Sequence, residues 1–371
     1  MVRRPSPRAY AGQWLLLLVV VAVAWLLVSD AGDNLERRNM VFGFGFLADR
    51  ANFDIPFRLM PWVESDTYGR ALLVSFLNTL LVAALSVIAA TLLGLLVGIM
   101  RLSVNWLVRN IALAFIEFVR NTPQLIQIIF WYVAVLQTLP GPRASIVLPG
   151  GVLLNIRGLY LPNAAFTPVG SAMSWIALIA LVATPFVWRL RIREARLGVA
   201  ALVLPLAAAV LLVAGIDHVN WPTLRGFNIV GGTQVPPELV ALWAGLSIYT
   251  SAFIAEIVRG SIEAVPKGQH EAALGLGLRS WQRLFLIVLP QALRIMIPQL
   301  TSQYLNIIKS STLGAAVACP EIFQIFAGTV MQQASKEIEI MIIVMAIFLG
   351  INLLTSAFMN WYNRRVALIE R

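Results

Sequence analysis

Charged residues are scarce in this chain of 371 residues. Only 12% of them are Asp, Glu, Lys or Arg, whereas 59% are hydrophobic. A soluble globular domain carries roughly 25% charged residues, so about half of the charge that would keep such a chain in water is missing. The composition therefore excludes an ordinary soluble protein and predicts a chain that is solvated by lipid.

Cysteine pairs, catalytic clusters and phosphate-binding loops are also missing. Cys319 has no partner for a disulfide framework, and the glycines show no collagen-like period of three. His218 and His270 are isolated, so the sequence offers neither a metal-ligand set nor a nucleophile beside a base. No G-x-x-x-x-G-K-[ST] motif is present. We predict that the chain is not an enzyme, has no catalytic or metal-binding residue and binds no cofactor of its own.

Long apolar runs are abundant. A helix needs about 17 to 25 such residues to cross a bilayer, and eight segments meet or approach that length: residues 14–28, 71–100, 123–139, 168–187, 197–216, 238–258, 291–308 and 338–361. The first follows arginines but lacks a convincing cleavage site, so we interpret it as an uncleaved anchor rather than a signal peptide. The fold class predicted is all-α, a polytopic membrane protein with about eight transmembrane helices.

The positive charge lies in alternate connections between these spans. Lys and Arg outnumber Asp and Glu by 28 to 18, a formal net charge of +10. Arginines gather at 101–109, 189–196, 259–283 and in the C-terminal tail, whereas residues 30–70 mix both signs. Because cytoplasmic connections are rich in Lys and Arg, the pattern predicts that the N-terminus and the C-terminus are cytoplasmic. It also explains the basic balance without a nucleic-acid partner.

Residues 105–127 do not form a simple span. Glu117 and Arg120 would be costly if each were buried unpaired in lipid, although their spacing allows a mutual ion pair. We expect an interfacial helix that ends near Arg120, with both charges close to the cytoplasmic surface. The next helix is expected to begin with Thr122 as its capping residue and Pro123 as its first residue.

Residues 309–326 are a second irregular stretch. They are apolar but are interrupted by Ser310, Ser311, Gly314 and Pro320. Irregular backbone at membrane depth is tolerated only where protein or a water-filled cavity covers it. This stretch is therefore a candidate part of a permeation pathway.

Residues 259–290 form the longest polar connection and are predicted to lie in the cytoplasm. Pro266 and Gly268 indicate a turn, and Glu271 is expected in the first turn of a short helix, where a negative charge suits the helix dipole. Gly277 can take the left-handed position that ends this helix, and Ser280 can cap the next one. We predict a short helix on the membrane surface whose small residues fit the groove of another protein.

The spacing of this connection resembles the EAA signature of ABC-importer permeases. Glu271, Ala272 and Ala273 are followed after three residues by Gly277, and nine residues later by residues 287–290, Ile-Val-Leu-Pro. The resemblance implies that an ATPase subunit contacts Gly268, Gln269, Glu271, Ala272, Ala273, Gly277 and Pro290.

Two other stretches resemble the polar amino acid branch of that family. Arg120, Thr122, Pro123 and Gln127 fit an R-x-T-P-x-x-x-Q pattern, and residues 309–313 fit a K-x-S/T-S/T-L pattern. The resemblance implies a five-helix type I permease core in a bacterial inner membrane. It also implies an ATPase subunit that binds ATP and is present in two copies. The further partners it implies are a second permease subunit and a periplasmic amino-acid-binding protein that delivers an amino acid.

The chain is longer than the short members of this branch. Residues 1–70 add a cytoplasmic N-terminus, an anchor helix and an external loop, while residues 71–363 form the permease domain. Within that domain, about 140–237 is an insertion of two spans, and 259–290 is the coupling loop. Enlarged permeases of this kind resemble the subunits of general L-amino acid importers, in which two different long permeases pair.

Several polar groups in or beside the spans are candidates for a substrate pathway, because such groups should face protein or a cavity rather than lipid. They are Asn78, Thr79, Arg120, Thr122, Gln127, Gln299, Asn306, Lys309, Ser310 and Ser311. A lysine such as Lys309 could bind the carboxylate of an amino acid, but it could equally anchor the helix at the membrane surface. Likewise, Arg120 either contributes to transport or extends to the interface without such a role.

We predict a permease subunit of an ATP-driven amino acid importer. The alternative is a secondary transporter driven by an ion gradient, which usually shows inverted repeats and acidic residues at the membrane midplane. The sequence shows no convincing repeat of halves. Glu117 and Glu256 lie near the ends of the predicted spans.

Overall fold

The computed structural model describes residues 7–37, 42–167 and 214–366, together with the single positions 170, 173, 176, 207 and 210. Most of these residues are helical, in agreement with the predicted all-α membrane class, although short strands are also present. The α-helices in chain order are α1 (Pro7–Arg37), α2 (Tyr68–Arg101), α3 (Trp106–Asn121), α4 (Gln124–Ile129), α7 (Pro237–Glu263), α8 (Lys267–Gly275), α9 (Ser280–Arg283), α10 (Leu289–Ser310), α11 (Met331–Ala334) and α12 (Glu337–Val366).

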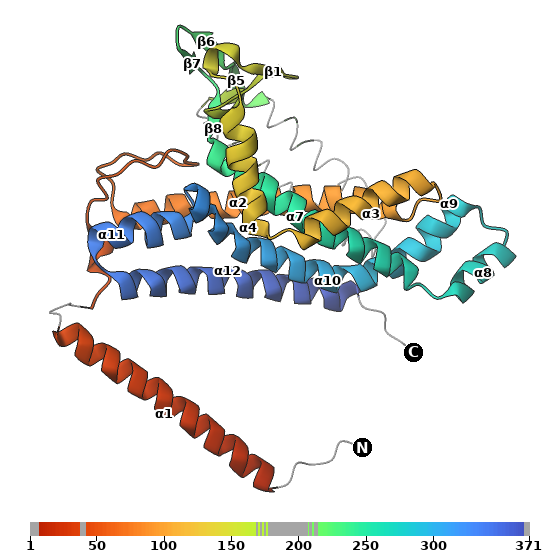
Figure 1. The fold of residues 1–371 in the computed structure, drawn as a ribbon, viewed down its shortest axis with the longest axis horizontal. Helices are drawn as coiled ribbons and strands as arrows, with labels where there is room; N and C mark the ends of the chain where they lie inside the picture. Colours follow the sequence, from red (N-terminus) through yellow and green to blue (C-terminus); the bar gives the residue numbers. More distant parts are fainter. Residues whose placement is uncertain are drawn as a thin grey trace.

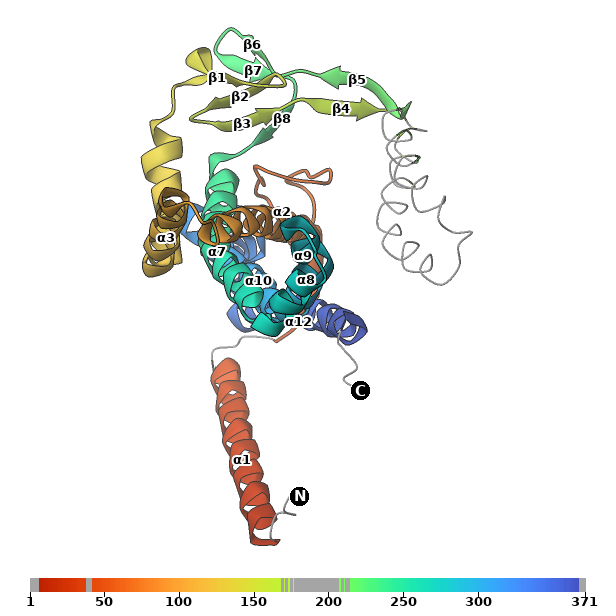
Figure 2. The same cartoon turned by 90° about the vertical axis from the view of Figure 1, so that its right-hand side faces the viewer.

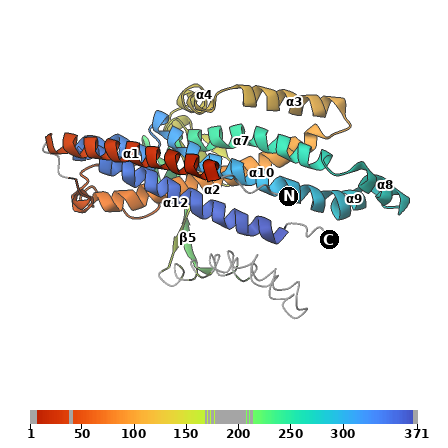
Figure 3. The same cartoon turned by 90° about the horizontal axis from the view of Figure 1, so that it is seen from below.

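The long helices α2, α7, α10 and α12 run side by side through the centre of the protein (Figures 1 and 3). In the described part of the chain, four helical stretches are long and apolar enough to cross a membrane: Tyr68–Arg101, Pro237–Glu263, Ser280–Val317 and Glu337–Asn363. They contain the second, sixth, seventh and eighth predicted spans. Helix α1 covers the first, and α4 with the π-helical turn Phe130–Val135 covers most of the third. The fourth and fifth predicted spans fall almost entirely outside the described residues.

Two glycines allow α2 and α7 to approach closely. A Cβ atom at Gly94 would lie 2.6 Å from the Cβ of Ile254, and one at Gly98 would lie 2.8 Å from the Cβ of Val258. Small residues four positions apart are a common way for membrane helices to bring their backbones together. Ile254 and Val258 are almost fully buried in this contact and form part of the main hydrophobic core.

Helices α3 and α4 are separated by a break at Thr122 and Pro123, as the sequence predicts, but the capping differs. Thr122 does not cap α4: its hydroxyl donates to the carbonyl of Phe118 at 2.8 Å, and Pro123 precedes the first residue of α4. The predicted position of Glu117 and Arg120 near the cytoplasmic surface stays a prediction. Helix α3 lies along α2 and α7, and Arg120 is about 20 Å along the helix from Trp106.

The irregular stretch after α10 is a compact reversal of the chain. A 3-10 helix (Ser311–Val317) ends at Ala318, whose φ is 56°, and a π-helix (Phe323–Val330) follows. The buried carboxylate of Glu321 accepts the backbone N–H groups of Phe323 at 2.9 Å and Gln324 at 2.7 Å, which satisfies the start of that helix. Residues 46–74 pack against this part of the chain and form a second core cluster with α12.

The described part of the inserted segment carries eight short strands that the sequence analysis does not predict. Strands β1 (Ile146–Leu148), β2 (Val152–Asn155), β3 (Gly158–Leu161) and β8 (Thr233–Val235) form an antiparallel sheet in that order. Strand β4 (Asn163–Phe166) pairs with β5 (Ile216–Asn220), and β6 (Thr223–Arg225) pairs with β7 (Asn228–Val230). Figures 1 and 2 show these strands beyond the ends of α4 and α7.

The close contact between α2 and α7 predicts that Gly94→Ala and Gly98→Ala each destabilise the protein by about 1 to 3 kcal/mol, because an added methyl group must push the two helices apart. The measurement is the free energy of unfolding in mixed detergent micelles. Gly350→Ala is the matched control, since a Cβ atom at this position of α12 meets no atom within 4 Å. Equal stability of all three variants would contradict the role of this contact.

Candidate functional site

The predicted coupling loop forms two short helices beyond the ends of α7 and α10 (Figure 1). Helix α8 ends at Gly275, and Gly277 adopts the left-handed conformation with φ of 71°. The N–H of Gly277 donates to Leu274 O at 2.9 Å, and the N–H of Leu278 donates to Ala273 O at 3.1 Å. This pair of bonds is the Schellman arrangement, which satisfies the last carbonyls of a helix and favours glycine at its left-handed position.

Two details of the loop differ from expectation. Glu271 is the fifth residue of α8 and therefore lies in the second turn, not the first. Helix α9 is preceded by Arg279 rather than capped by Ser280, and the N–H of Arg279 donates to Gln282 Oε1 at 2.9 Å.

Most of the coupling loop is exposed, but its contacts with neighbouring residues hold it in place. Ala273 is buried, whereas Gly268, Gln269, Glu271, Ala272, Gly277 and Pro290 are exposed. The side chain of Gln291 donates to Gln269 Oε1 at 3.3 Å, which ties α8 to the start of α10. Beneath it, Val265, Val288 and Ala292 form a small core of their own.

An ion-paired arginine stabilises the C-terminal end of α7. Arg259 donates from Nε at 3.0 Å and from Nη2 at 2.8 Å to Glu256 Oε2, and it also bonds Glu263. Glu256, which the sequence places near the end of a span, is therefore ion-paired in the structure. The exit of α7 toward the loop is held by two carboxylates on one guanidinium.

Two candidate pathway residues, Asn78 and Thr79, lie in the protein interior. Asn78 Nδ2 donates to the carbonyls of Phe57 and Pro320, both at 2.8 Å, and Thr79 Oγ1 accepts the N–H of Ile322 at 3.0 Å. Both side chains are at most 1% exposed. In this conformation they fasten α2 to the chain reversal near Pro320.

Arg120, Thr122 and Gln127 surround the break between α3 and α4. The amide of Gln127 donates to Val119 O at 2.9 Å and to Thr122 O at 3.2 Å, so it satisfies carbonyls left unpaired at the end of α3. The exposed Arg120 does not pair with Glu117; its guanidinium lies 5.2 Å from the ring centre of Phe253 on α7. Phe253 in turn packs on Tyr249.

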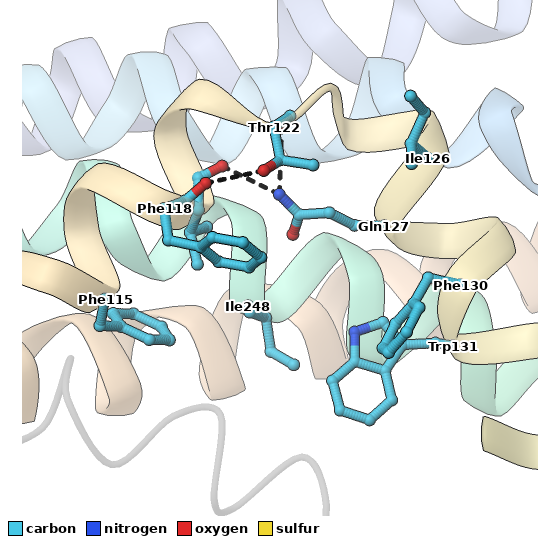
Figure 4. A pocket seen from close by; sticks show the side chains of 9 residues that line it. Phe115, Phe118, Thr122, Ile126, Gln127, Phe130, Trp131 and Ile248 are labelled. Carbon is cyan, nitrogen blue, oxygen red and sulfur yellow. Dashed lines mark hydrogen bonds between the residues drawn. The ribbon is translucent and has the colours of Figure 1, made fainter. Parts of the chain in front are cut away.

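An apolar pocket lies beside the break between α3 and α4 (Figure 4). Its volume is about 430 Å³, and its lining is almost entirely aromatic and aliphatic: Phe115, Phe118, Val119, Thr122, Ile126, Gln127, Phe130, Trp131 and Ile248. The hydrogen bonds of Thr122 and Gln127 are directed to the backbone of α3 and not into the pocket. The pocket therefore offers apolar contact and little hydrogen bonding.

Helix α10 presents a polar stripe, which we define as Gln299, Ser302, Asn306 and Lys309. All four are exposed, and their spacing of three, four and three residues places them on one face of the helix. The sequence reasoning missed Ser302, although the same periodicity predicts it. By contrast, the exposed face of α12 is apolar, with Met345, Leu349 and Leu353 each at least 60% exposed.

Lys309 stands at the end of the polar stripe that is remote from the coupling loop. The hydroxyls that follow it bond backward to the helix, Ser311 Oγ to Ile308 O at 2.8 Å and Thr312 Oγ1 to Lys309 O at 2.9 Å. Ser310 is half-buried and Ser311 is buried. Of these neighbours, Lys309 alone extends an exposed charge, and no carboxylate of the described residues pairs with it.

Comparison with known proteins identifies what this arrangement resembles. Residues 90–368 match the family described as "Binding-protein-dependent transport system inner membrane component". YhdX of Escherichia coli (strain K12) is 44% identical, and the match covers 99% of this chain and 96% of that protein. The "General L-amino acid transport system permease protein AapQ" of Rhizobium johnstonii is 42% identical over 99% of this chain and 94% of its own length.

A solved structure shares the fold. The "Crystal structure of an amino acid ABC transporter with histidines" superposes with a TM-score of 0.51 at 19% sequence identity. The match covers 80% of this chain and 95% of that one. This likeness supports the helical arrangement described above.

The interior position of Asn78 predicts that Asn78→Leu lowers the free energy of unfolding by about 2 to 4 kcal/mol, because the buried carbonyls of Phe57 and Pro320 lose their donor. Chemical denaturation of the purified protein measures this change. Gln299→Leu on the exposed stripe should leave stability unchanged. A fully stable Asn78→Leu variant that no longer transports would instead make Asn78 a pathway residue.

Proposed function

Because the chain belongs to the family of binding-protein-dependent transport system inner membrane components, we propose that it is a permease subunit of an ATP-driven amino acid importer. It is a multi-pass membrane transport component and not an enzyme. Two copies of an ATPase subunit hydrolyse ATP and dock on the coupling loop. A second, different long permease completes the pathway, and a periplasmic binding protein delivers the amino acid.

The observation that carries this proposal is the exposed apolar surface of the coupling loop. Leu274, Leu276 and Trp281 are 58%, 76% and 58% exposed, although the loop lies beyond the end of the long helices. Exposed apolar side chains clustered in a polar loop are typical of a surface that another protein covers. The ATPase subunit is the partner that this family provides for such a surface.

The coupling loop can transmit motion because it joins two helices that bear on the pathway. Helix α7 is held to α2, whereas α10 begins through the π-helical turn Leu284–Val288 and contains Pro298 in its interior. Wide turns and internal prolines are the places where a helix bends. Movement of α8 and α9 on ATP binding therefore tilts α10, provided that the ATPase contacts differ between the two states.

The polar stripe of α10 is the pathway surface contributed by this subunit. Amide, hydroxyl and ammonium groups in a span are too costly to face lipid, so they must face water or protein. Helix α7 lies beside both α10 and α3, and the ring of Phe253 on α7 lies against the guanidinium of Arg120. The second permease closes the pathway opposite these residues, and Lys309 meets the carboxylate of an arriving amino acid.

The coupling role predicts that Gly277→Val and Glu271→Ala abolish uptake and separate ATP hydrolysis from transport, while the protein remains in the membrane. A β-branched residue at φ of 71° is strained and opens the turn after α8. Uptake and ATPase activity of the full complex in proteoliposomes measure both effects. Gly275→Ala, two residues away and without steric conflict, is the control. Normal coupled uptake by the first two variants would remove the main support for this role.

The pathway role predicts that Ser302→Leu and Asn306→Leu slow uptake at least about tenfold without lowering the amount of protein in the membrane. Apolar side chains on the stripe remove the groups that hydrate the passage. The matched control is Asn360→Leu on α12, an exposed amide away from the stripe. Equal loss of uptake in all three variants would show that the stripe has no special part in transport.

A further inference from the structure

Three arginines from separate segments meet at the β6–β7 hairpin of the inserted sheet. Arg225 ends β6 and stands opposite Asn228 in the strand register. Arg157, in the turn between β2 and β3, donates from Nη1 to Asn228 Oδ1 at 2.7 Å. Arg143 lies with its guanidinium 3.7 Å from the ring centre of Phe227. We call Arg143, Arg157, Arg225 and Phe227 the arginine hairpin.

The arginine hairpin is held in place by the fold. Gln234 on β8 donates to the carbonyl of Arg157 at 2.8 Å, and the ring of Trp221 packs so closely on Gly151 that a Cβ atom there would lie 2.6 Å away. The turns use glycines in the left-handed region, including Gly226 with φ of 63°. The positive charges are therefore preorganised on a short, braced hairpin.

These arginines have no negative partner. None of the three forms an ion pair with a carboxylate among the residues that the structure describes, and all three are exposed. The single acid in the described part of the insertion, Asp217, bonds His218 on β5. Figure 2 shows β5 extending away from β6 and β7.

The sheet lies on the side of the membrane opposite the coupling loop. Strand β8 leads directly into α7, and α8 follows the other end of α7 after 27 helical residues, about 40 Å along the axis. If the coupling loop meets a cytoplasmic ATPase, the arginine hairpin is periplasmic. Arginines are favoured in the cytoplasmic loops of membrane proteins, so the membrane orientation of the protein does not explain three arginines on the periplasmic side.

The surroundings of the arginines are typical of a protein contact. Phe227 is 72% exposed and lies against the guanidinium of Arg143, on a hairpin that projects from the helices, and Trp221 just before this hairpin is 52% exposed. Arginine and large aromatic residues dominate the binding energy of protein interfaces. Binding to lipid headgroups would not require exposed aromatic side chains on a hairpin that projects beyond the helices.

We propose that the arginine hairpin is the docking surface for an acidic face of the soluble amino-acid-binding protein. This inference rests on the proposed function, since it names the surface at which the delivering partner binds. Complementary charge across such a contact accelerates association and sets orientation, and salt weakens it.

The test uses the full importer complex in nanodiscs, with its amino-acid-binding protein loaded with substrate as the probe. The measurement is the concentration of binding protein that half-maximally stimulates ATP hydrolysis. Reversal of all three charges, R143E with R157E and R225E, should raise that concentration about tenfold or more at low salt, with a smaller effect at high salt. ATP hydrolysis without the binding protein should not change.

Two matched variants separate docking from folding. Arg225→Glu alone alters no side-chain contact of the sheet and should give part of the shift. Arg50→Glu, which reverses an exposed arginine of the 42–67 segment, should give none. An unchanged half-maximal concentration in the triple variant, or an equal shift with Arg50→Glu, would overturn the proposal.

The lipid alternative is tested in the same assay. The shift should persist in nanodiscs that contain only zwitterionic lipid, and its disappearance there would assign the arginines to anionic headgroups and overturn the docking surface. A wild-type complex that the binding protein fails to stimulate would contradict the proposed function itself, and the docking surface with it.

Discussion

The close contact between α2 and α7 is the constraint on which the rest of the protein depends. Because Gly94 and Gly98 present no side chain, α7 can lie against α2 and keep its remaining faces for other neighbours. Gly245 of α7 receives Ile128 of α4, Leu242 packs on Gly314, and Phe253 lies under Arg120. Helix α7 is thus the fixed axis of the fold, with the inserted sheet at one end and the coupling loop at the other.

A fixed α7 makes the junctions around it the places where movement is possible. Each of the three π-helical segments of the described chain lies at such a junction: Phe130–Val135 below the sheet, Leu284–Val288 at the coupling loop, and Phe323–Val330 after the chain reversal. Such turns sacrifice regular hydrogen bonding and are often found at functional positions. Tyr132, in the first of them, still donates a hydrogen bond to Glu238 at the start of α7, so this turn below the sheet is tied to α7.

The sequence predicts the spans and the coupling loop because length, apolar content and glycine at a helix end act locally. Gly277 takes its left-handed position, and the break after Arg120 is present. What depends on long-range contacts could not be predicted. Asn78 resembles a pathway residue in sequence but bonds carbonyls of Phe57 and Pro320, which lie 21 and 242 positions away. The contact of Arg120 with Phe253 depends on how α3 packs against α7, and the short strands lack the clear alternation that would reveal them.

The exposed residues of this subunit differ in chemistry from surface to surface, and each difference indicates a different neighbour. Helix α12 exposes Met345 and Leu349, which suit lipid, whereas α10 exposes Asn306 and Lys309, which do not. Beyond the helices, both the coupling loop and the inserted sheet expose tryptophan to water. At the sheet, Arg143 lies against the exposed Phe227 and none of the described arginines there pairs with an acid, which favours a neighbour with negative charge. The composition of each surface therefore specifies a partner that the isolated chain lacks.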